Sequence, residues 1–499
     1  MPKSPNWLLV FALAGSLHAA VKLPALISDH MVLQEGVPVR IWGSADPGES
    51  VRVEFQGQAV TAKAADNGQW SLWLKPLSAA GPLEMNVNGT AIKDVLVGEV
   101  WLGSGQSNME FALNQANNHE EEIARADYPL IHVFLVKRIV ADRPAEDVAG
   151  TWQVCTPENA PRFSAVEYFF GRALHNYLHV PMGLIESYWG GTPVESWTSA
   201  PALKSDAALQ YVGEEWDKVL AAYPAAKATY DQRVATWEKT AAEARAAGKT
   251  PPNRPGAPPG PGHPNTPAGL YNGMIAPLTP YIIRGVIWYQ GESNANEAHA
   301  WRYRRIFAGM IQDWRKQWGE GDFPFLFVQL ANFRSNGWWP VLRESQTETL
   351  SLRNTGMAVS IDIGDGGNIH PKDKQDAGMR LALVARHVAY HDSAVEYSGP
   401  MFRQATPENS TLRVWFSHAD GLQAKGNAAL TGFTIAGADG KFVPADARIE
   451  GATIVVSSTE VASPVAVRYA WADDPVCNLI NQAGLPAGPF RSDEPAYAQ

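Results

Sequence analysis

From about Asp94 the chain alternates between short apolar runs and longer segments whose apolar residues repeat with a helical period. The apolar runs lack a regular polar alternation, which is typical of strands buried on both faces of a parallel sheet. Helical periodicity is clearest over residues 166–177, 301–318 and 374–390. This order predicts an α/β fold in which helices cover both faces of a parallel sheet. The candidate strands are Val95–Leu102, Ile131–Val136, Gly183–Tyr188, Ile282–Tyr289, Phe323–Leu330 and Met357–Ile363.

The regions on either side of this alternation have a period of two instead. Val51 and Val53 share one face of a strand before it, and Leu412 and Val414 share one face of a strand after it. Alternation of this kind, interrupted by Gly, Pro and Asn turns, predicts β-sandwich-like modules. The expected parts are a leader over 1–20, an N-terminal module over 21–93, the α/β domain over 94–397 and a C-terminal module over 398–499.

An insertion over about 203–268 interrupts the alternation inside the α/β domain. Trp216, Tyr223, Tyr230 and Trp237 lie in two stretches with helical spacing, and a Pro-rich segment over Pro251–Pro267 follows them. We expect a helical hairpin with a stiff, extended return. Such an insertion serves either as a lid over a site or as a packing element, and the sequence favours neither.

The first 20 residues have the layout of a secretory signal peptide. Lys3 gives a positive start, Trp7–Ala14 is apolar, and small residues precede Val21. This predicts export to the periplasm or the extracellular space. No other run reaches the roughly 18 apolar residues that a membrane span needs, so no membrane partner is expected.

Charge and cysteine content exclude further classes of protein. Lys and Arg number 41 against 51 Asp and Glu, a net charge of −10, which disfavours non-specific nucleic-acid binding. Cys155 and Cys477 are the only cysteines, so a disulfide scaffold is excluded, although these two could pair with each other. The histidines include no HExxH motif and are not clustered into a ligand set, so no metal is expected.

Two polar segments at predicted strand ends carry groups suited to nucleophilic catalysis. Gly103–Glu110 places Ser107 between a strand and the start of a helix over about 108–116, near unpaired backbone N–H groups that can stabilise an oxyanion. His370 follows the last buried strand and has the residue type of a general base. A serine helix cap and a surface histidine are the alternatives. Gly190, Gly191 and Gln290 follow two other strands and supply candidate hydrogen-bond donors.

Three blocks resemble the sialate O-acetylesterase family of the SGNH/GDSL hydrolase superfamily. They are GQSNM at Gly105–Met109, WYQGESNA at Trp288–Ala295 and IHPKDK at Ile369–Lys374, and the resemblance extends over essentially the whole mature chain, in the bacterial branch of the family. It implies an SGNH-type three-layer αβα core. It also implies removal of O-acetyl groups from carbohydrate by a serine mechanism without a cofactor.

The resemblance also implies roles for individual residues. Ser107 would be the nucleophile and His370 the general base. The oxyanion would be bound by the N–H of Ser107, the N–H of Gly190 or Gly191, and Gln290, with Asn108 and Glu292 in the same site.

The acid of the triad is not defined by the resemblance. Many superfamily members carry Asp three residues before the histidine, but this chain has Gly367 there. Asp365 and Asp362 on the same loop are the first candidates and Glu292 is a third. A backbone carbonyl could orient the ring instead, which would leave a Ser–His dyad.

Two other functions remain as alternatives to an esterase. A glycoside hydrolase would use Glu292 and Asp365 as its carboxyl pair. A non-catalytic carbohydrate-binding protein would use tryptophans, of which Trp338 and Trp339 lie in the most loop-like context. The expected partner is an acetylated carbohydrate in which sialic acid, xylan and xyloglucan remain open choices, and the oligomeric state cannot be predicted.

Overall fold

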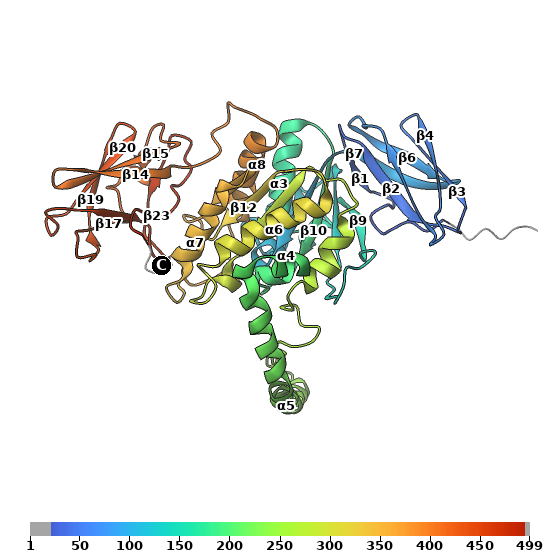
Figure 1. Cartoon of the computed structure of the whole chain (residues 1–499), viewed down its shortest axis with the longest axis horizontal. Helices are drawn as coiled ribbons and strands as arrows, with labels where there is room; N and C mark the ends of the chain where they lie inside the picture. Colours follow the sequence, from blue (N-terminus) through green and yellow to red (C-terminus); the bar gives the residue numbers. More distant parts are fainter. Residues whose placement is uncertain (1–20, 495–499) are drawn as a thin grey trace, which may run out of the picture.

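The computed structural model describes residues 21–494, so the expected leader over 1–20 lies outside the described residues. The molecule is elongated, with a central α/β body and a β-rich part at each end (Figure 1). A single long helix, α5 (Gln210–Ala246), projects from the middle of the body. Among residues 21–494, no helix is both long and apolar enough to cross a bilayer.

The central sheet has the strand order β13-β12-β11-β7-β10-β8-β9. All neighbouring pairs are parallel except β8 with β9, which are antiparallel. The six apolar runs each form a strand, and β9 is an additional edge strand whose half-buried residues gave no continuous apolar signal. The bounds are β7 (Thr90–Gly105), β8 (Tyr128–Val136), β9 (Gly150–Cys155), β10 (Met182–Tyr188), β11 (Gly285–Tyr289), β12 (Phe325–Gln329) and β13 (Thr355–Val359).

The register of the three central strands determines where the site can form. Gly105 at the end of β7 pairs in register with Tyr188 at the end of β10 and with Tyr289 at the end of β11. Because the three strands end at the same level, the segments that follow them meet at one edge of the sheet. Sites of open α/β sheets form at this carboxyl edge.

Helices cover both faces of this sheet. Trp101 of β7 packs on Phe170 of α3 (Ala165–Leu178), and α8 (Lys374–Val388) packs against α3. Trp288 of β11 points to the opposite face, where it stacks on Phe307 of α6 (Tyr303–Trp318). Helix α7 (Trp339–Glu348) packs against α6. The chain therefore has the predicted α/β fold with a three-layer αβα core, and additional β-rich parts flank it.

The N-terminal β-rich part is joined to the core by a shared strand. β7 pairs with β6 at its beginning and continues without a break into the central sheet, so residues 93 and 94 lie inside one strand. β3 buries every second residue, as its sequence alternation predicts. The strands of this part are β1 (Val32–Gln34), β2 (Val39–Ser44), β3 (Ser50–Phe55), β4 (Gln58–Lys63), β5 (Gln69–Leu74) and β6 (Ala80–Val87).

The C-terminal part contains two four-stranded antiparallel sheets, with the orders β14-β15-β20-β19 and β18-β17-β21-β23, and the two-stranded antiparallel sheet β16-β22. The loop after β21 holds it to the core, because the buried Arg343 of α7 donates to the carbonyl oxygens of Ala472 and Asp473. Its strands are β14 (Met401–Glu408), β15 (Thr411–Ser417), β16 (Gln423–Ala424), β17 (Phe433–Ala436), β18 (Val443–Pro444), β19 (Asp446–Glu450), β20 (Thr453–Ser457), β21 (Ala466–Tyr469), β22 (Leu479–Ile480) and β23 (Phe490–Arg491).

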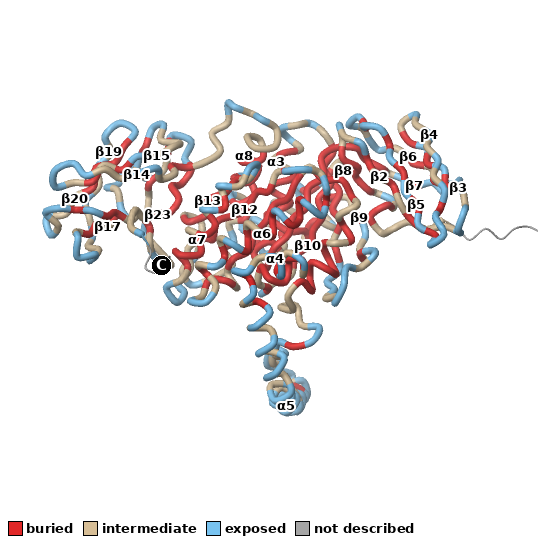
Figure 2. Tube along the Cα trace, viewed as in Figure 1, coloured by how far each residue is buried: buried red, intermediate tan, exposed pale blue. Residues whose placement is uncertain are grey.

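The insertion is not the predicted helical hairpin. The two periodic stretches belong to one continuous helix, α5, which runs through Pro224 and is largely exposed (Figure 2). Trp216, Tyr223, Tyr230 and Trp237 are spaced by two helical turns, so one unbroken helix keeps them on one side. The Pro-rich segment returns along this helix, where the indole of Trp237 donates to the carbonyl oxygen of Pro252.

The prediction that Trp338 and Trp339 lie in a loop is also wrong, because Trp339 begins helix α7. Its side chain is only 3% exposed, and its indole N–H donates to the carbonyl oxygen of Ala331. Trp339 is therefore a core residue and is not available to stack on a sugar. Cys155 and Cys477 are free thiols and do not pair.

Candidate active site

Ser107 lies two residues beyond β7, at the first position of the short helix α1 (Ser107–Glu110). The turn that presents it needs glycine at position 105, where φ is +138° and a Cβ atom would overlap the carbonyl oxygen of Tyr289. The predicted helix over 108–116 is shorter than expected. It ends at Glu110, and a separate 3-10 turn (Leu113–Gln115) follows.

Ser107 and His370 form a hydrogen-bonded pair. His370 Nε2 lies 2.8 Å from Ser107 Oγ, although the two residues are 263 positions apart in the chain. The side chain of Asn368 holds the loop that carries the histidine, since the N–H of His370 donates to Asn368 Oδ1 at 3.0 Å. A hydroxyl and an imidazole at this distance are the minimal arrangement for an activated nucleophile.

The surroundings of His370 keep its imidazole neutral. Burial lowers the pKa of His370, the nearby charge of Lys374 lowers it further, and the carboxylate of Glu110 acts in the opposite direction. The net effect is a pKa below 6.5, the ordinary value for histidine. At neutral pH the ring is therefore ready to accept a proton.

Neither aspartate of the loop is brought to His370. Both carboxylate oxygens of Asp362 accept hydrogen bonds from Arg380, and Lys425 adds a further one. Asp365 is exposed and accepts from the backbone N–H of Gly367. Within residues 21–494, Nδ1 of His370 has no hydrogen-bond partner. The arrangement around the serine is thus a Ser–His pair.

Gly190 lies directly beside Ser107. A Cβ atom at position 190 would stand 3.3 Å from Ser107 Cβ, whereas Gly191 (φ +76°) has open space around it. The N–H of Gly190 donates to Glu110 Oε2 at 2.7 Å, and the other oxygen of Glu110 pairs with Arg138. One candidate oxyanion donor is therefore occupied by a carboxylate of the protein itself.

Gln290 is buried beneath the loops and is not directed at Ser107. Its side-chain NH₂ donates to the carbonyl oxygen of Thr192 and to Asn294 Oδ1, and its Oε1 accepts from the hydroxyl of Tyr303. These bonds use both amide hydrogens. Gln290 thus ties together the loops after β10 and β11.

A buried network of Asn108, Glu292 and Lys374 joins the three sequence blocks. Lys374 Nζ donates to Asn108 Oδ1 at 2.6 Å, and Asn108 Nδ2 donates to Glu292 Oε1 at 2.5 Å and to the carbonyl oxygen of Ile369 at 3.0 Å. The Lys374 ammonium also lies 4.8 Å from the ring centroid of Phe111. Because Ile369 immediately precedes His370, this network connects the serine block with the histidine block.

Burial governs the charges of this network. It raises the pKa of Glu292 and lowers the pKa of Lys374 to about 7, while the attraction between the two groups opposes both changes. Oε2 of Glu292 is buried and has no hydrogen-bond partner in the described part of the chain. Glu292 thus lies in this buried network, whereas Asp365 is exposed and accepts from the N–H of Gly367.

Comparison with known proteins identifies the family of this chain. A family model described as a carbohydrate esterase, sialic acid-specific acetylesterase, matches residues 263–385. The human sialate O-acetylesterase is 30% identical, and the match covers 94% of this chain and 92% of that protein. The rat sialate O-acetylesterase is 31% identical, with 94% of each chain covered. This chain belongs to the sialate O-acetylesterase family.

A solved structure supports the same assignment over the whole fold. A carbohydrate acetylesterase from Xanthomonas citri superposes with a TM-score of 0.81 at 39% identity, and the match covers 95% of this chain and 100% of that one. As a member of the sialate O-acetylesterase family, the chain is a carboxylic ester hydrolase of the carbohydrate esterase type. The family resemblance predicted from the three blocks is confirmed.

Sequence reasoning missed two charged residues of this candidate site. Glu110 stands three residues after Ser107, and this spacing brings side chains onto one face of a helix. Lys374 stands at the first position of α8, where a cation is disfavoured by the helix dipole, so its presence there was a signal. Among residues 21–494, no cluster of three His, Cys, Asp or Glu side chains could hold a metal ion.

Proposed function

We propose that this protein removes O-acetyl groups from a carbohydrate, with Ser107 as nucleophile and His370 as general base and general acid. The 2.8 Å contact between Ser107 Oγ and His370 Nε2 is the observation that carries the proposal. The lowered pKa of His370 supports it, because a base must be unprotonated before it can act.

The reaction has two halves. Ser107 Oγ attacks the acetyl carbonyl carbon while its proton moves to Nε2 of His370. The resulting imidazolium donates this proton to the sugar oxygen as the ester bond breaks, which leaves an acetyl group on Ser107. Water then attacks the acetyl-enzyme, His370 accepts its proton and returns one to Oγ, and acetate leaves.

Backbone donors at the helix start stabilise the oxyanion in this scheme. The N–H of Ser107 lies in the first turn of α1 and has no intrahelical acceptor. The N–H of Gly190 becomes a second donor once Glu110 Oε2 releases it. Gln290 contributes indirectly, by holding the loop that carries Gly190.

No carboxylate accepts a hydrogen bond from His370 in this scheme. Glu110 instead acts through space, because its negative charge favours the imidazolium that forms during the reaction. The proposal is therefore a Ser–His dyad assisted by a carboxylate that stands on the serine helix.

Substitution of the nucleophile tests the proposal. Ser107→Ala should lower acetate release from an acetylated sugar by about 10³-fold or more, and a fluorophosphonate probe should no longer label the protein. Ser104→Ala is the matched control, since Ser104 is buried in β7 and its hydroxyl has no partner within residues 21–494. Retention of most of the activity by Ser107→Ala would exclude the serine mechanism.

In this proposal the substrate is an acetylated carbohydrate. We infer that the acyl group is acetyl from the names of the relatives. The curated relatives are named sialate O-acetylesterases, and the Xanthomonas citri protein is described as a carbohydrate acetylesterase. Acetate release from an acetylated sialoside and from an acetylated xylo- or xyloglucan oligosaccharide, measured side by side, distinguishes anionic from neutral substrates.

Export to the periplasm or the extracellular space is part of the same proposal. It is supported by the positive start, the apolar stretch and the small-residue exit of residues 1–20. N-terminal sequencing of the mature protein tests it. A mature chain that begins close to Val21 agrees with export, and an intact Met1 in the cytosolic fraction contradicts it.

A further inference from the structure

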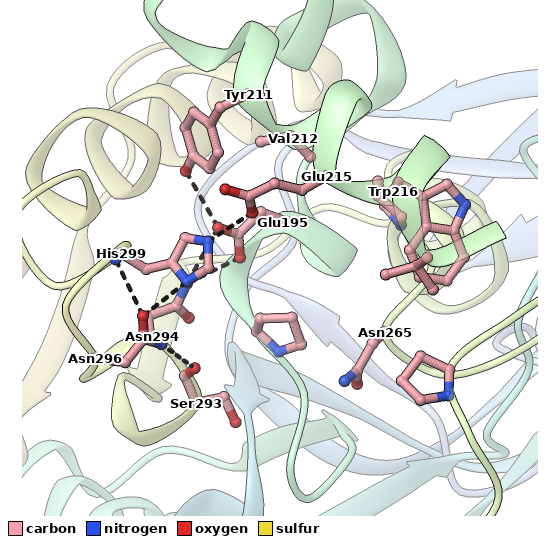
Figure 3. A pocket seen from close by; sticks show the side chains of 14 residues that line it. Glu195, Tyr211, Val212, Glu215, Trp216, Asn265, Ser293, Asn294, Asn296 and His299 are labelled. Carbon is pink, nitrogen blue, oxygen red and sulfur yellow. Dashed lines mark hydrogen bonds and ion pairs between the residues drawn. The ribbon is translucent and has the colours of Figure 1, made fainter. Parts of the chain in front are cut away.

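A separate pocket lies between the α/β body and the start of the insertion. Its volume is about 260 Å³, and Figure 3 shows it between the first turns of α5 and the loops that follow β10 and β11. The Pro-rich return closes it at Pro259, Asn265 and Pro267. We propose that this pocket is a subsite for one neutral sugar ring of the glycan whose acetyl group reaches Ser107. The inference rests on the proposed esterase function.

The pocket and the nucleophile are built on the same two loops. Pro193 lines the pocket and is three residues from Gly190, so their Cα atoms are at most about 11 Å apart. Ser293 also lines the pocket, and its N–H donates to Oε1 of Gln106, the residue before Ser107, at 3.2 Å. A sugar bound in the pocket would therefore stand close enough to Ser107 to belong to the same oligosaccharide.

The size and the apolar side of the pocket fit a sugar ring. A cavity of about 150 Å³ accommodates a benzene ring, so 260 Å³ has room for a single six-membered ring with its hydroxyl groups. Trp216 of α5 is partly exposed and forms the aromatic wall. In Figure 3 its indole stands across the cavity from Glu195 and His299. An aromatic wall that faces a few placed polar groups is the usual composition of a small-ligand site.

The polar side of the pocket is held in place before any ligand binds. Glu195 is only 7% exposed, and its carboxylate accepts from Asn294 Nδ2 at 2.9 Å and from the hydroxyl of Tyr211 at 3.2 Å. His299 bridges Glu215 Oε2 at 2.9 Å and Asn296 Oδ1 at 3.0 Å. Carboxylates and amides fixed in this way are strong acceptors and donors for sugar hydroxyl groups.

The charges around the pocket favour a neutral ring over an acidic one. Arg302 lies 3.5 Å from Glu215 and offsets its charge, whereas no Lys or Arg of residues 21–494 forms an ion pair with the carboxylate of Glu195. The carboxylate of a sialic acid would meet this negative charge inside a confined space, where like charges repel strongly. The glycan implied is therefore a neutral oligosaccharide, such as an acetylated xylo- or xyloglucan oligosaccharide.

The first experiment compares a long and a short substrate in the Trp216→Ala variant. We expect kcat/KM for an acetylated xylo-oligosaccharide to fall about ten-fold or more, and kcat/KM for 4-nitrophenyl acetate to stay within two-fold of the original. Trp216→Phe should recover most of the loss. Leu220→Ala is the control and should behave like the unchanged protein, because Leu220 is an exposed residue of the same helix that does not line the pocket.

Each other outcome has a defined meaning. Equal losses on both substrates would show that Trp216 supports the fold of the catalytic loops, which overturns the subsite. No loss on either substrate also overturns it. An equal loss on an acetylated sialyl-oligosaccharide would overturn the choice of a neutral ring. Ser107→Ala abolishes turnover of every substrate if the proposed function is correct, so failure of that function is seen separately.

The second experiment needs no turnover. In the Ser107→Ala background, binding of a deacetylated xylo-oligosaccharide should be measurable by calorimetry, and adding Trp216→Ala should weaken this binding about ten-fold or more. Equal binding with and without Trp216 would overturn the subsite even if the serine mechanism holds.

Discussion

The buried ammonium of Lys374 donates a hydrogen bond to Oδ1 of Asn108 at 2.6 Å, and the same asparagine is the residue that follows Ser107. Through the second hydrogen bond of Asn108, to the carbonyl oxygen of Ile369, the contact also reaches the residue before His370. One cation thus joins the two halves of the proposed catalytic pair, Ser107 and His370. It also lies close enough to lower the pKa of His370.

The first prediction concerns the charge of Lys374. Its own pKa of about 7 means that it is charged at the acidic pH values where His370, with a lowered pKa, gains its proton. Lys374→Met removes this charge, so the pKa of His370 should rise and the acidic limb of the kcat/KM profile should move to higher pH. Activity at the optimum should fall about ten-fold, because Oδ1 of Asn108 loses its donor.

Lys372→Met is the matched control for this experiment. Lys372 is exposed, stands two residues from Lys374, and does not act on the pKa of His370. Its pH profile should overlay that of the unchanged enzyme. An acidic limb that stays in place in Lys374→Met would show that the lysine only supports packing.

The second prediction concerns Glu110, whose removal should shift the acidic limb of the kcat/KM profile in the opposite direction. Glu110 raises the pKa of His370, so Glu110→Gln should lower that pKa and move the acidic limb to lower pH. The glutamine oxygen can still accept from the N–H of Gly190. The lost ion pair with Arg138 should cost no more than about 1 kcal/mol, since both side chains are partly exposed. The measurement is kcat/KM against pH for acetate release.

Glu122→Gln serves as the control for Glu110→Gln. It removes a carboxylate from another arginine pair, with Arg172, that does not act on His370. A shift of the limb in this control would mean that the overall charge of the protein, rather than Glu110, is responsible. A limb that moves to higher pH in Glu110→Gln would contradict the assigned sign.

The third prediction separates structure from catalysis at Asp362 and Asp365. Asp362→Asn should lower the free energy of unfolding by about 3 kcal/mol, because the buried Arg380 loses the charge of Asp362 and keeps only the exposed Asp376 as an anionic partner. Asp365→Asn should change it by less than about 0.5 kcal/mol, since that side chain is exposed. Both variants should keep kcat within a few-fold of the original, because neither carboxylate is brought to His370. Loss of turnover by orders of magnitude in a folded variant would identify that residue as the acid of a triad.

The pH dependence of the Asp362 effect follows from its pKa. Burial alone would raise the pKa of Asp362, but hydrogen bonds and the charge of Arg380 bring it below its usual value. A carboxyl with a lowered folded pKa stabilises the protein above its unfolded pKa, and this contribution is lost as the pH falls through the folded pKa. The stability difference between the original protein and Asp362→Asn should therefore be greatest at neutral pH and shrink in acid, which thermal unfolding measures.

Much of the sheet and the pairing of Ser107 with His370 could be predicted from the sequence. Strands buried on both faces leave continuous apolar runs such as Ile282–Tyr289, and a parallel sheet brings the segments that follow its strands to one edge. That is why Ser107 and His370 could be expected together although 263 positions separate them. The local sequence signal for the site is an apolar strand followed by a polar segment that contains glycine.

The partners of buried polar side chains could not be predicted, because they depend on directions that a sequence does not encode. Gln290 follows a strand at the site edge, yet its amide turns inward to Thr192 and Asn294. Asp362 lies on the histidine loop, yet its carboxylate accepts a hydrogen bond from Arg380 of α8 and none from His370. The insertion was misjudged for a different reason, since its aromatic residues were taken as two helical stretches, whereas α5 continues unbroken between them through Pro224.

The last prediction compares the adjacent residues Gly190 and Gly191. One has little space for a side chain, and the other has a strained backbone conformation for any residue except glycine. Gly190 has an ordinary backbone conformation but little space, since an added Cβ would lie 3.0 Å from Glu110 Oε2 and 3.3 Å from Ser107 Cβ. Gly191 has open space but a φ of +76°, which costs a non-glycine residue about 1–2 kcal/mol. Gly190→Ala should therefore lower kcat about 100-fold through a displaced nucleophile, with little change in unfolding free energy.

Gly191→Ala should show the opposite pattern, because its added methyl group contacts nothing within 4 Å and only the backbone is strained. We expect a loss of about 1 kcal/mol in unfolding free energy and a kcat close to that of the original. The two variants add the same methyl group one residue apart, so each is the control for the other. Similar activity in both, measured as acetate release beside thermal unfolding, would mean that Gly190 does not border the reacting serine, and the oxyanion role of its N–H would then have to be abandoned.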